Sequence, residues 1–236
     1  MADNMIRNTG TVAHAQSVVN VFMRGVYLWM GIGLGITAVA AWYVLNNDAF
    51  MNFLYNNSTV LFGLIIVELG FVFAISMFLN KLSGTTVTLL FVAYSLLSGI
   101  TLAPILALYT SASLARVFVA CAAMFGGMSV YGLVTKRDLT SWGSFLFMGL
   151  IGIIVASLIN MFLKSPAVHY IISYVGVLVF LGLTAYDTQK LRVMGESAPH
   201  DDRTAIRRAT VYGALTLYLD FINLFLMLLR IAGDRR

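Results

Sequence analysis

Residues 211–231 read VYGALTLYLDFINLFLMLLRI and place a carboxylate, Asp220, in the middle of an otherwise apolar run. On insertion scales, an aspartate at the centre of a membrane helix costs roughly 2.5 to 3.5 kcal/mol, so it is expected to face protein or water and not lipid. Asp220 is therefore the first candidate functional residue of the chain.

The composition of the whole chain is that of an integral membrane protein. Of the 236 residues, 60% are hydrophobic and 11% are charged, whereas soluble domains have roughly half apolar and about a quarter charged residues. The apolar stretches are continuous and do not alternate in segments of about ten residues, which disfavours a β-barrel. The predicted fold class is an all-α membrane protein.

The apolar runs predict seven transmembrane helices, since about 20 helical residues cross roughly 30 Å of hydrocarbon. These spans cover residues of about 26–45, 59–79, 85–109, 114–134, 142–163, 168–190 and 211–231. They make residues 26–231 the transmembrane domain, between an N-terminal tail, 1–25, and a short C-terminal tail, 232–236. The stretch NNDAFMNFLYNNS marks the boundary after the first span, and ESAPHDDR is typical of a solvated turn.

Lysine and arginine residues predict the orientation in the membrane. The side with the N-terminus collects ten of the 15, namely Arg7, Arg24, Lys81, Lys136, Arg137, Lys190, Arg192, Arg203, Arg207 and Arg208. The other side collects the remaining five, Arg116, Lys164, Arg230, Arg235 and Arg236. By the positive-inside rule, the N-terminus is cytoplasmic, and seven spans put the C-terminus outside. A re-entrant last segment is the alternative.

Several function classes are disfavoured by the sequence. The net charge of +5 comes from basic residues between and beside the spans, where charge sets topology, so nucleic acid is not an expected partner. There is no nucleophile elbow, phosphate loop or paired-histidine motif. We therefore expect no enzymatic activity and no cofactor. The single Cys121, inside an apolar run, is expected to pack as a small hydrophobe.

Small residues recur at helix-packing spacing, which predicts close backbone approach within a tight bundle. The pairs are Gly31 with Gly35, Ala122 with Gly126, Ala123 with Gly127, and Gly152 with Ala156. In the third span, Pro104 removes a backbone donor and is expected to kink or interrupt the helix.

Asp220 belongs to a polar stripe. Gly213, Thr216, Asp220 and Asn223 follow the three-four spacing that puts them on one helix face. A second aspartate, Asp187, lies near the end of the sixth span, and the two can meet if that helix continues beyond Lys190. We predict that it does.

Two carboxyl groups at hydrogen-bond distance cannot both ionise easily, so such a pair shares a proton and titrates as a unit. This behaviour would make Asp187 and Asp220 a pH sensor. The alternative is a purely structural hydrogen bond that fixes helix register. For Asp220, function is favoured because an asparagine would form a hydrogen bond at lower cost; for Asp187, the spacing favours neither alternative.

Glu68 is a third carboxyl group inside an apolar run, at the centre of VLFGLIIVELGFVFAISMF. Only Ser76 lies distantly on the same face. Two alternatives are open: Glu68 completes a cation path, or it is held protonated against a backbone carbonyl.

The chain resembles the Bax inhibitor motif family of membrane proteins, in particular its bacterial branch. The resemblance is carried by LTAYDTQKL, ALTLYLDFINLFLMLLRI, SLLSGITLAPI and MFGGMSVYGLVTKRDL and extends from about Val21 onward. It implies six transmembrane helices around a central seventh, and a paired-aspartate site at Asp187 and Asp220. The basic residue that closes the pore in relatives lies on the second helix; Lys81 is the nearest candidate here, without a secure match.

The resemblance also implies a pH-dependent calcium leak across the cell (inner) membrane, with calcium as the permeating ion and as a transient ligand of Asp187 and Asp220. Thr216, Asn223, Glu68 and Lys81 are accessory candidates. An alternative from bacterial relatives is a regulatory protein that modulates a membrane-bound protease or a stress response, through residues 1–24 or a helix surface. A proton-coupled transporter is disfavoured, because the sequence contains no convincing internal repeat.

Overall fold

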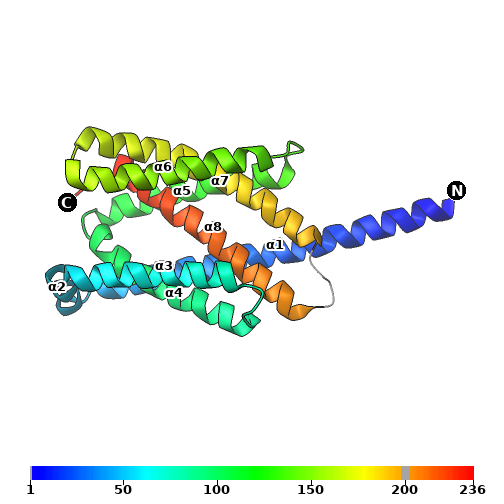
Figure 1. Cartoon of the computed structure of the whole chain (residues 1–236), viewed down its shortest axis with the longest axis horizontal. Helices are drawn as coiled ribbons and strands as arrows, with labels where there is room; N and C mark the ends of the chain where they lie inside the picture. Colours follow the sequence, from blue (N-terminus) through cyan, green and yellow to red (C-terminus); the bar gives the residue numbers. More distant parts are fainter. Residues whose placement is uncertain (1, 198–201) are drawn as a thin grey trace. The chain divides into compact units, whose positions relative to one another are not determined.

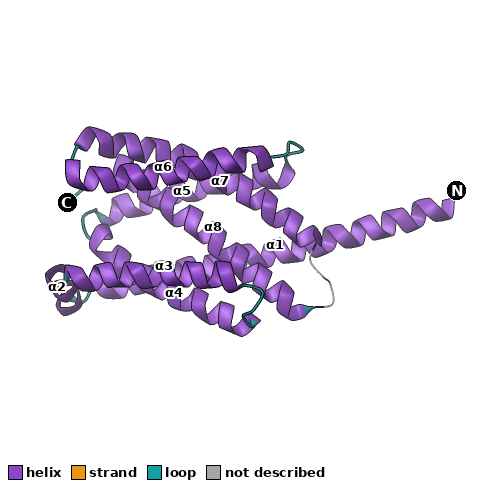
Figure 2. Cartoon of the chain, in the orientation of Figure 1, coloured by secondary structure: helices purple, strands orange, loops and turns teal. Residues whose placement is uncertain are grey.

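A computed structural model of the chain describes residues 2–197 and 202–236. Within these ranges every regular element is a helix (Figures 1 and 2), and the only bridge of β type joins Tyr109 to Arg235. The helices are α1 (Ala2–Leu45), α2 (Asp48–Asn56), α3 (Ser58–Phe78), α4 (Gly84–Leu106), α5 (Ser111–Val134), α6 (Thr140–Leu163), α7 (Pro166–Ser197) and α8 (Arg203–Ala232).

Seven of these helices are long and apolar enough to cross a membrane: the part Val19–Leu45 of α1, then α3, α4, α5, α6, α7 and, in α8, Thr204–Ala232. The predicted all-α membrane fold with seven spans is confirmed. Burial is greatest in α8, where 56% of the most apolar window is buried, against 6% in α3. This is the pattern expected for a helix that has neighbours on several sides.

A short helix, α2, forms where the sequence predicted only a boundary. Asn47 caps it, because the side-chain oxygen accepts a hydrogen bond of 3.0 Å from the backbone N–H of Phe50. Leu54 is buried, whereas Phe53 and Tyr55 are exposed. The boundary stretch is therefore an amphipathic helix, and the missed signal was the asparagine cap.

The sixth span continues beyond Lys190, as predicted, because α7 ends only at Ser197. Residues 198–201, half of the predicted ESAPHDDR turn, lie outside the described residues. The last helix begins at Arg203 instead of about Val211. There Asp202 Oδ1 accepts hydrogen bonds from the backbone N–H groups of Thr204 (2.9 Å) and Ala205 (3.0 Å), which starts the helix early.

Pro104 lies in the last turn of α4, which ends at Leu106 and not at Tyr109. Because proline supplies no backbone N–H, the carbonyl of Ile100, four residues earlier, loses its regular helical partner, and the hydrogen-bond ladder is interrupted two residues before the helix ends. The predicted interruption is therefore at the end of the helix.

The chain divides into two compact units, and α4, α7 and α8 each contribute residues to both of them. Unit 1 contains Met1–Thr101 and Leu191–Leu215, and unit 2 contains Leu102–Lys190 and Thr216–Arg236. In unit 1, α1 and α4 pack closely, because Thr37 Oγ1 donates a hydrogen bond of 2.8 Å to the Ser95 carbonyl. A Cβ at Gly99 would lie 2.4 Å from the Thr37 carbonyl oxygen, so only glycine fits there.

In unit 2, α5 and α7 approach at Gly132, where an added Cβ would lie 2.4 Å from the Ala185 carbonyl oxygen. The C-terminal segment of the chain is also fixed in this unit. Asp234 forms a salt bridge with Arg116, and its backbone N–H donates to Ser113 Oγ at 2.8 Å. The C-terminal residues are therefore tied to the start of α5.

The close helix packing predicted at the small-residue pairs is wrong at the five glycines of these pairs. A Cβ added at Gly31, Gly35, Gly126, Gly127 or Gly152 would meet no described atom within 4 Å. Close approach occurs instead at glycines that the spacing did not select, among them Gly99 and Gly132. Small residues at this spacing leave one face of a helix smooth. Whether another helix packs on that face depends on the arrangement of the neighbouring helices.

Candidate functional site

Asp187 lies on α7, and the residue after it fixes the rotation of this helix. Thr188 is fully buried, and its hydroxyl forms a hydrogen bond of 3.1 Å with the hydroxyl of Ser129 on α5. Successive residues of a helix point about 100° apart. With Thr188 held against α5, Asp187 points to a different side, toward α8.

The next residue, Gln189, ties α7 to the connection between α5 and α6. Its side-chain oxygen accepts a hydrogen bond of 2.8 Å from the backbone N–H of Leu139, and its amide nitrogen donates to the Arg137 carbonyl at 2.9 Å. A side-chain amide that satisfies both a donor and an acceptor of one loop fixes that loop on the helix. Consecutive side chains of the YDTQK sequence thus contact different parts of the protein. Thr188 contacts α5, and Gln189 binds the connection between α5 and α6.

Asp220 lies on α8, and here again the following residue is anchored on α5. The ring of Phe221 makes edge contacts with Phe118 and Phe125, with centroid distances of 5.5 and 5.4 Å. The Cys121 thiol donates to the Phe221 carbonyl at 3.7 Å. These contacts fix the rotation of α8 and leave Asp220 on the side that faces α7.

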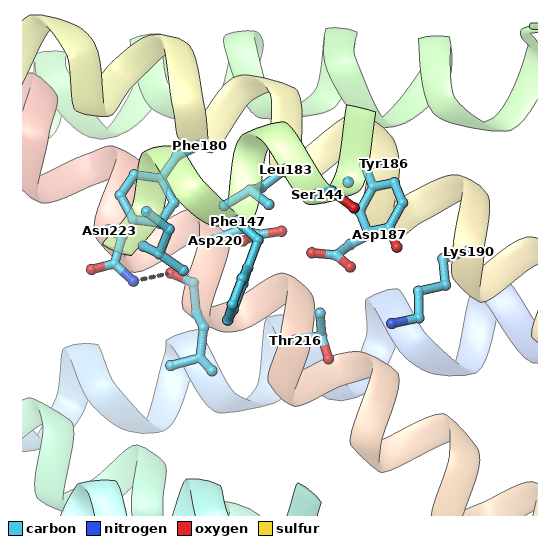
Figure 3. A pocket seen from close by; sticks show the side chains of 13 residues that line it. Ser144, Phe147, Phe180, Leu183, Tyr186, Asp187, Lys190, Thr216, Asp220 and Asn223 are labelled. Carbon is cyan, nitrogen blue, oxygen red and sulfur yellow. Dashed lines mark hydrogen bonds between the residues drawn. The ribbon is translucent and has the colours of Figure 1, made fainter. Parts of the chain in front are cut away.

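The two carboxyl groups face each other within hydrogen-bonding reach (Figure 3). Asp220 is buried, with 5% of its surface exposed. Among the described residues, no ordinary donor reaches its Oδ2 atom. Two carboxylates without a proton cannot hydrogen-bond each other, so the pair is satisfied by one shared proton, by water or by a cation. The structure therefore brings together the two aspartates that the sequence singled out.

The pair opens into a pocket of about 490 Å³ formed by α6, α7 and α8. Its polar lining consists of Ser144, Tyr186, Asp187, Lys190, Thr216, Asp220 and Asn223, and its apolar lining includes Phe147, Phe180, Leu183 and Leu219. A cavity of this size has room for several water molecules beside the two carboxyl groups.

Thr216 and Asn223 line this pocket together with Asp220, so the polar stripe predicted on α8 points into one cavity. The Asn223 amide donates to the Leu219 carbonyl at 2.8 Å, which fixes the side chain against its own helix (Figure 3). Gly213, the first member of the stripe, belongs to unit 1, where its Cβ position contacts Leu191 and Val26. The part of the stripe that lines the pocket therefore begins at Thr216.

Tyr186 reaches the pocket because α6 has a glycine opposite its ring. A Cβ at Gly143 would lie 2.5 Å from Tyr186 Cζ. Neither residue was selected from the sequence. The contact requires glycine at 143, and no local pattern in α6 distinguishes it from the other glycines of that helix.

Lys190 is the basic residue that lines the pocket, three positions after Asp187. Its ammonium group lies 5.9 Å from the centroid of the Tyr186 ring and is close enough to attract the Asp187 carboxylate. The sequence analysis counted Lys190 only toward orientation, although its helical spacing from Asp187 was the signal. Lys81, the candidate taken from the resemblance, belongs to unit 1 and lies 5.9 Å from the Phe78 ring centroid.

Glu68 also belongs to unit 1, where it joins α3 to α4. The Thr101 hydroxyl donates a hydrogen bond of 2.7 Å to Glu68 Oε1. This partner is a side-chain hydroxyl, not the backbone carbonyl considered from the sequence. The partner was missed because Thr101 is 33 residues away in the chain, and sequence spacing relates only residues of one helix.

The aspartate pocket has the donors that suit a weakly held hard cation. Calcium takes six to eight oxygen ligands from carboxylates, amide carbonyls, hydroxyls and water. Asp187 and Asp220 supply two carboxylates, and Ser144, Thr216 and Asn223 supply neutral oxygens. Among the described residues, no cluster of three or more histidine, cysteine or acidic residues forms a closed metal site.

The fold and the site together define a multi-pass all-α membrane protein with a paired-aspartate site in its spans. The chain belongs to the family described as inhibitor of apoptosis-promoting Bax1, which it matches over residues 19–236. This finding confirms the resemblance inferred from the sequence motifs.

Bacterial relatives match nearly the whole chain. The inner membrane protein YbhL of Escherichia coli strain K12 is 51% identical over 226 residues, which cover 96% of this chain and 97% of YbhL. A protein of Borreliella burgdorferi is 46% identical over 93% of this chain and 94% of its own length. A Rickettsia prowazekii protein, RP147, is 42% identical over 91% of this chain and 90% of its own length.

Proposed function

We propose that this protein is a pH-sensitive calcium leak channel in which the Asp187–Asp220 pair gates the ion path. The observation that carries the proposal is the position of two facing carboxyl groups in a pocket that other polar side chains also line, within membrane-spanning helices. Ionisable residues in such segments are costly and, by default, mark ion pathways or proton relays.

The gating step follows from the protonation of the pair. With one shared proton, the carboxyl groups bind each other and hold α7 to α8. Loss of that proton leaves two like charges in contact, whose repulsion is strong where water is scarce. Rising pH therefore favours separation of the carboxylates, entry of water and binding of a cation between them.

The polar lining suggests how a calcium ion would be passed on. Carboxylate oxygens replace part of the hydration shell, and Ser144, Thr216 and Asn223 lie along the same pocket. Lys190 would compete with calcium for Asp187 and so act as the basic partner for which Lys81 was considered. Glu68, held by Thr101, would contribute to a cation path only as an accessory group.

The proposed location is the bacterial inner membrane, in line with the name of the relative YbhL. The proposed orientation, with the N-terminus in the cytoplasm and the C-terminus outside, rests on the distribution of lysine and arginine. Reporter fusions at each terminus test this orientation. A C-terminal fusion that is active only in the cytoplasm would contradict it.

Calcium flux into proteoliposomes, measured as a function of pH, tests the function. The wild type is expected to conduct more as the pH rises through the titration of the pair. Asp187→Asn and Asp220→Asn should each abolish this pH dependence, because neither variant retains two ionisable groups. Unchanged flux in both variants would exclude the pair as the gate.

Asp138→Asn is the matched control, since it makes the same chemical change outside the spans. Asp138 is exposed, and the Thr140 hydroxyl and backbone N–H that donate to it hold the pKa of its carboxyl below its usual range. This variant should keep the pH profile of the wild type. Flux that is absent from the wild type as well would contradict the channel function itself.

A further inference from the structure

A second pocket, of about 510 Å³, lies in unit 2 between the end of α6, the start of α7 and the end of α8. Its lining includes four nitrogen-bearing basic side chains, Lys164, His169, Arg230 and Arg235, and no acidic residue. It shares no lining residue with the aspartate pocket. The aspartate pair therefore does not account for the basic residues of this second pocket.

Within the described residues, no acidic side chain pairs with the three cations of this pocket. Lys164, Arg230 and Arg235 form no ion pair within the described residues, and the neighbouring carboxylate, Asp234, is engaged by Arg116. Arg230 is half-buried in the last turn of α8, where the helix dipole favours a cation. The helix dipole accounts for the position of Arg230. It does not account for Lys164 and Arg235, which come from two other segments and line the same pocket.

Backbone geometry adds to the positive character of the pocket. The C-cap of α6, Lys164, has a φ of 50°, in the left-handed region, and the chain turns there directly into α7 at Pro166. The start of α7 presents the positive end of the helix dipole to the pocket, while the N–H groups of Val168 and His169 donate to Ser165. The buried Nε2 atom of His169 also finds no hydrogen-bond partner among the described residues.

The surroundings indicate the kind of anion. Met161 and Tyr170 line the pocket and are exposed, and Phe162, Ile171 and Tyr174 continue the exposed apolar surface next to it, with Phe162 80% exposed. Tyrosines at such positions are typical of the interface between lipid and water. A ligand with a charged head and an apolar body matches this combination better than a free ion.

We propose that this pocket binds the phosphate headgroup of an anionic phospholipid. The phosphodiester interacts with Lys164, Arg230 and Arg235 beside the start of α7, and the acyl chains lie along the exposed apolar residues of α6 and α7. Lysine and arginine side chains near the membrane surface attract anionic lipid headgroups, and in the orientation proposed above this pocket faces the outer leaflet. The inference is independent of the aspartate pair and of any ion flux.

Native mass spectrometry of the full chain in detergent, with added phosphatidylglycerol or phosphatidylcholine, tests the proposal. The wild type is expected to retain phosphatidylglycerol selectively. Arg230→Gln/Arg235→Gln should weaken that retention by about fivefold for each removed charge. The control Lys136→Gln/Arg137→Gln removes two exposed charges from the connection between α5 and α6 and should bind as the wild type does.

The Lys164→Asn variant provides a second test, in which the half-buried Arg230 is left unchanged. Asparagine tolerates the left-handed conformation at this position, so the variant removes the charge and keeps the turn. It should lose about fivefold in phosphatidylglycerol binding and unfold at the same temperature as the wild type.

Inorganic phosphate and glycerol phosphate separate the two sources of a phosphate group. Neither is expected to compete at concentrations where phosphatidylglycerol saturates, since both lack the acyl chains. Competition at equal concentration would overturn the lipid assignment in favour of a soluble phosphate ligand. Equal retention of phosphatidylglycerol by the wild type and the Lys164→Asn variant would overturn the pocket as the site.

Discussion

The hydroxyl groups of Ser129 and Thr188 form a hydrogen bond of 3.1 Å directly beside Asp187, so the residue next to the candidate gate is pinned to α5. Phe221, next to Asp220, is anchored on the same helix through Phe118 and Phe125. The neighbours of both aspartates thus fix helix rotation, and the carboxyl groups are turned toward each other as a consequence. This arrangement leads to predictions for both the supports and the pair.

Removal of the Ser129–Thr188 contact should destabilise the protein modestly. Hydrogen bonds between transmembrane helices average about 0.6 kcal/mol and reach roughly 1.7 kcal/mol. A double-mutant cycle with Ser129→Ala and Thr188→Val, measured by unfolding in detergent, should give a coupling energy in this range. Strict additivity of the two substitutions would show that the contact contributes nothing.

Gly143→Ala should destabilise the protein by about 1–3 kcal/mol, the usual cost of overpacking. The new Cβ would lie 2.5 Å from Tyr186 Cζ, so the ring that lines the aspartate pocket must move. Gly152→Ala on the same helix is the matched control, because its Cβ meets no described atom within 4 Å. The control should be neutral or slightly stabilising; equal effects of the two substitutions would contradict the close approach.

Asp220→Asn should stabilise the folded protein while it removes pH-dependent flux. The buried carboxyl group has an oxygen without an ordinary donor among the described residues. An asparagine amide can donate to Asp187 without placing a second charge in the pocket, a change expected to contribute about 1–3 kcal/mol. Thermal unfolding in detergent at mildly alkaline pH measures the gain. A lower midpoint than the wild type would contradict it, and Asp138→Asn should produce no comparable gain.

Thr101→Val should destabilise the protein more than Glu68→Gln does. The hydroxyl of Thr101 donates to Glu68 at 2.7 Å, and a glutamine oxygen can still accept that hydrogen bond, whereas valine leaves the acid without this donor. The expected difference in unfolding free energy is about 1 kcal/mol. If both variants unfold alike, the bond does not stabilise the contact between α3 and α4.

Cys121 should resist maleimide labelling in the folded protein and react only after denaturation. Its side chain is fully buried, and its thiol donates to the Phe221 carbonyl beside Asp220. A Cys121→Ser/Lys136→Cys variant, with its thiol in an exposed loop, provides the positive control. Rapid labelling of native Cys121 would show that α5 and α8 separate readily at this point.

The sequence by itself determined the number and type of the spans, because about 20 consecutive apolar residues satisfy the membrane only as a helix. It also singled out Asp187 and Asp220, since a carboxylate in such a run needs a polar partner or water. The YDTQK and LYLDF motifs were sufficient to indicate the family. These properties are local and can be read from composition and helical spacing.

Only the tertiary structure decided which groups meet. Lys190 instead of Lys81 lines the aspartate pocket, Thr101 binds Glu68, and Gly143 makes room for Tyr186, whereas Gly152 contacts nothing within 4 Å. Each of these contacts joins different helices or depends on which face of a helix a neighbour covers. Helical spacing defines the faces of one helix, but the packing of its neighbours determines which of those faces surround Asp220.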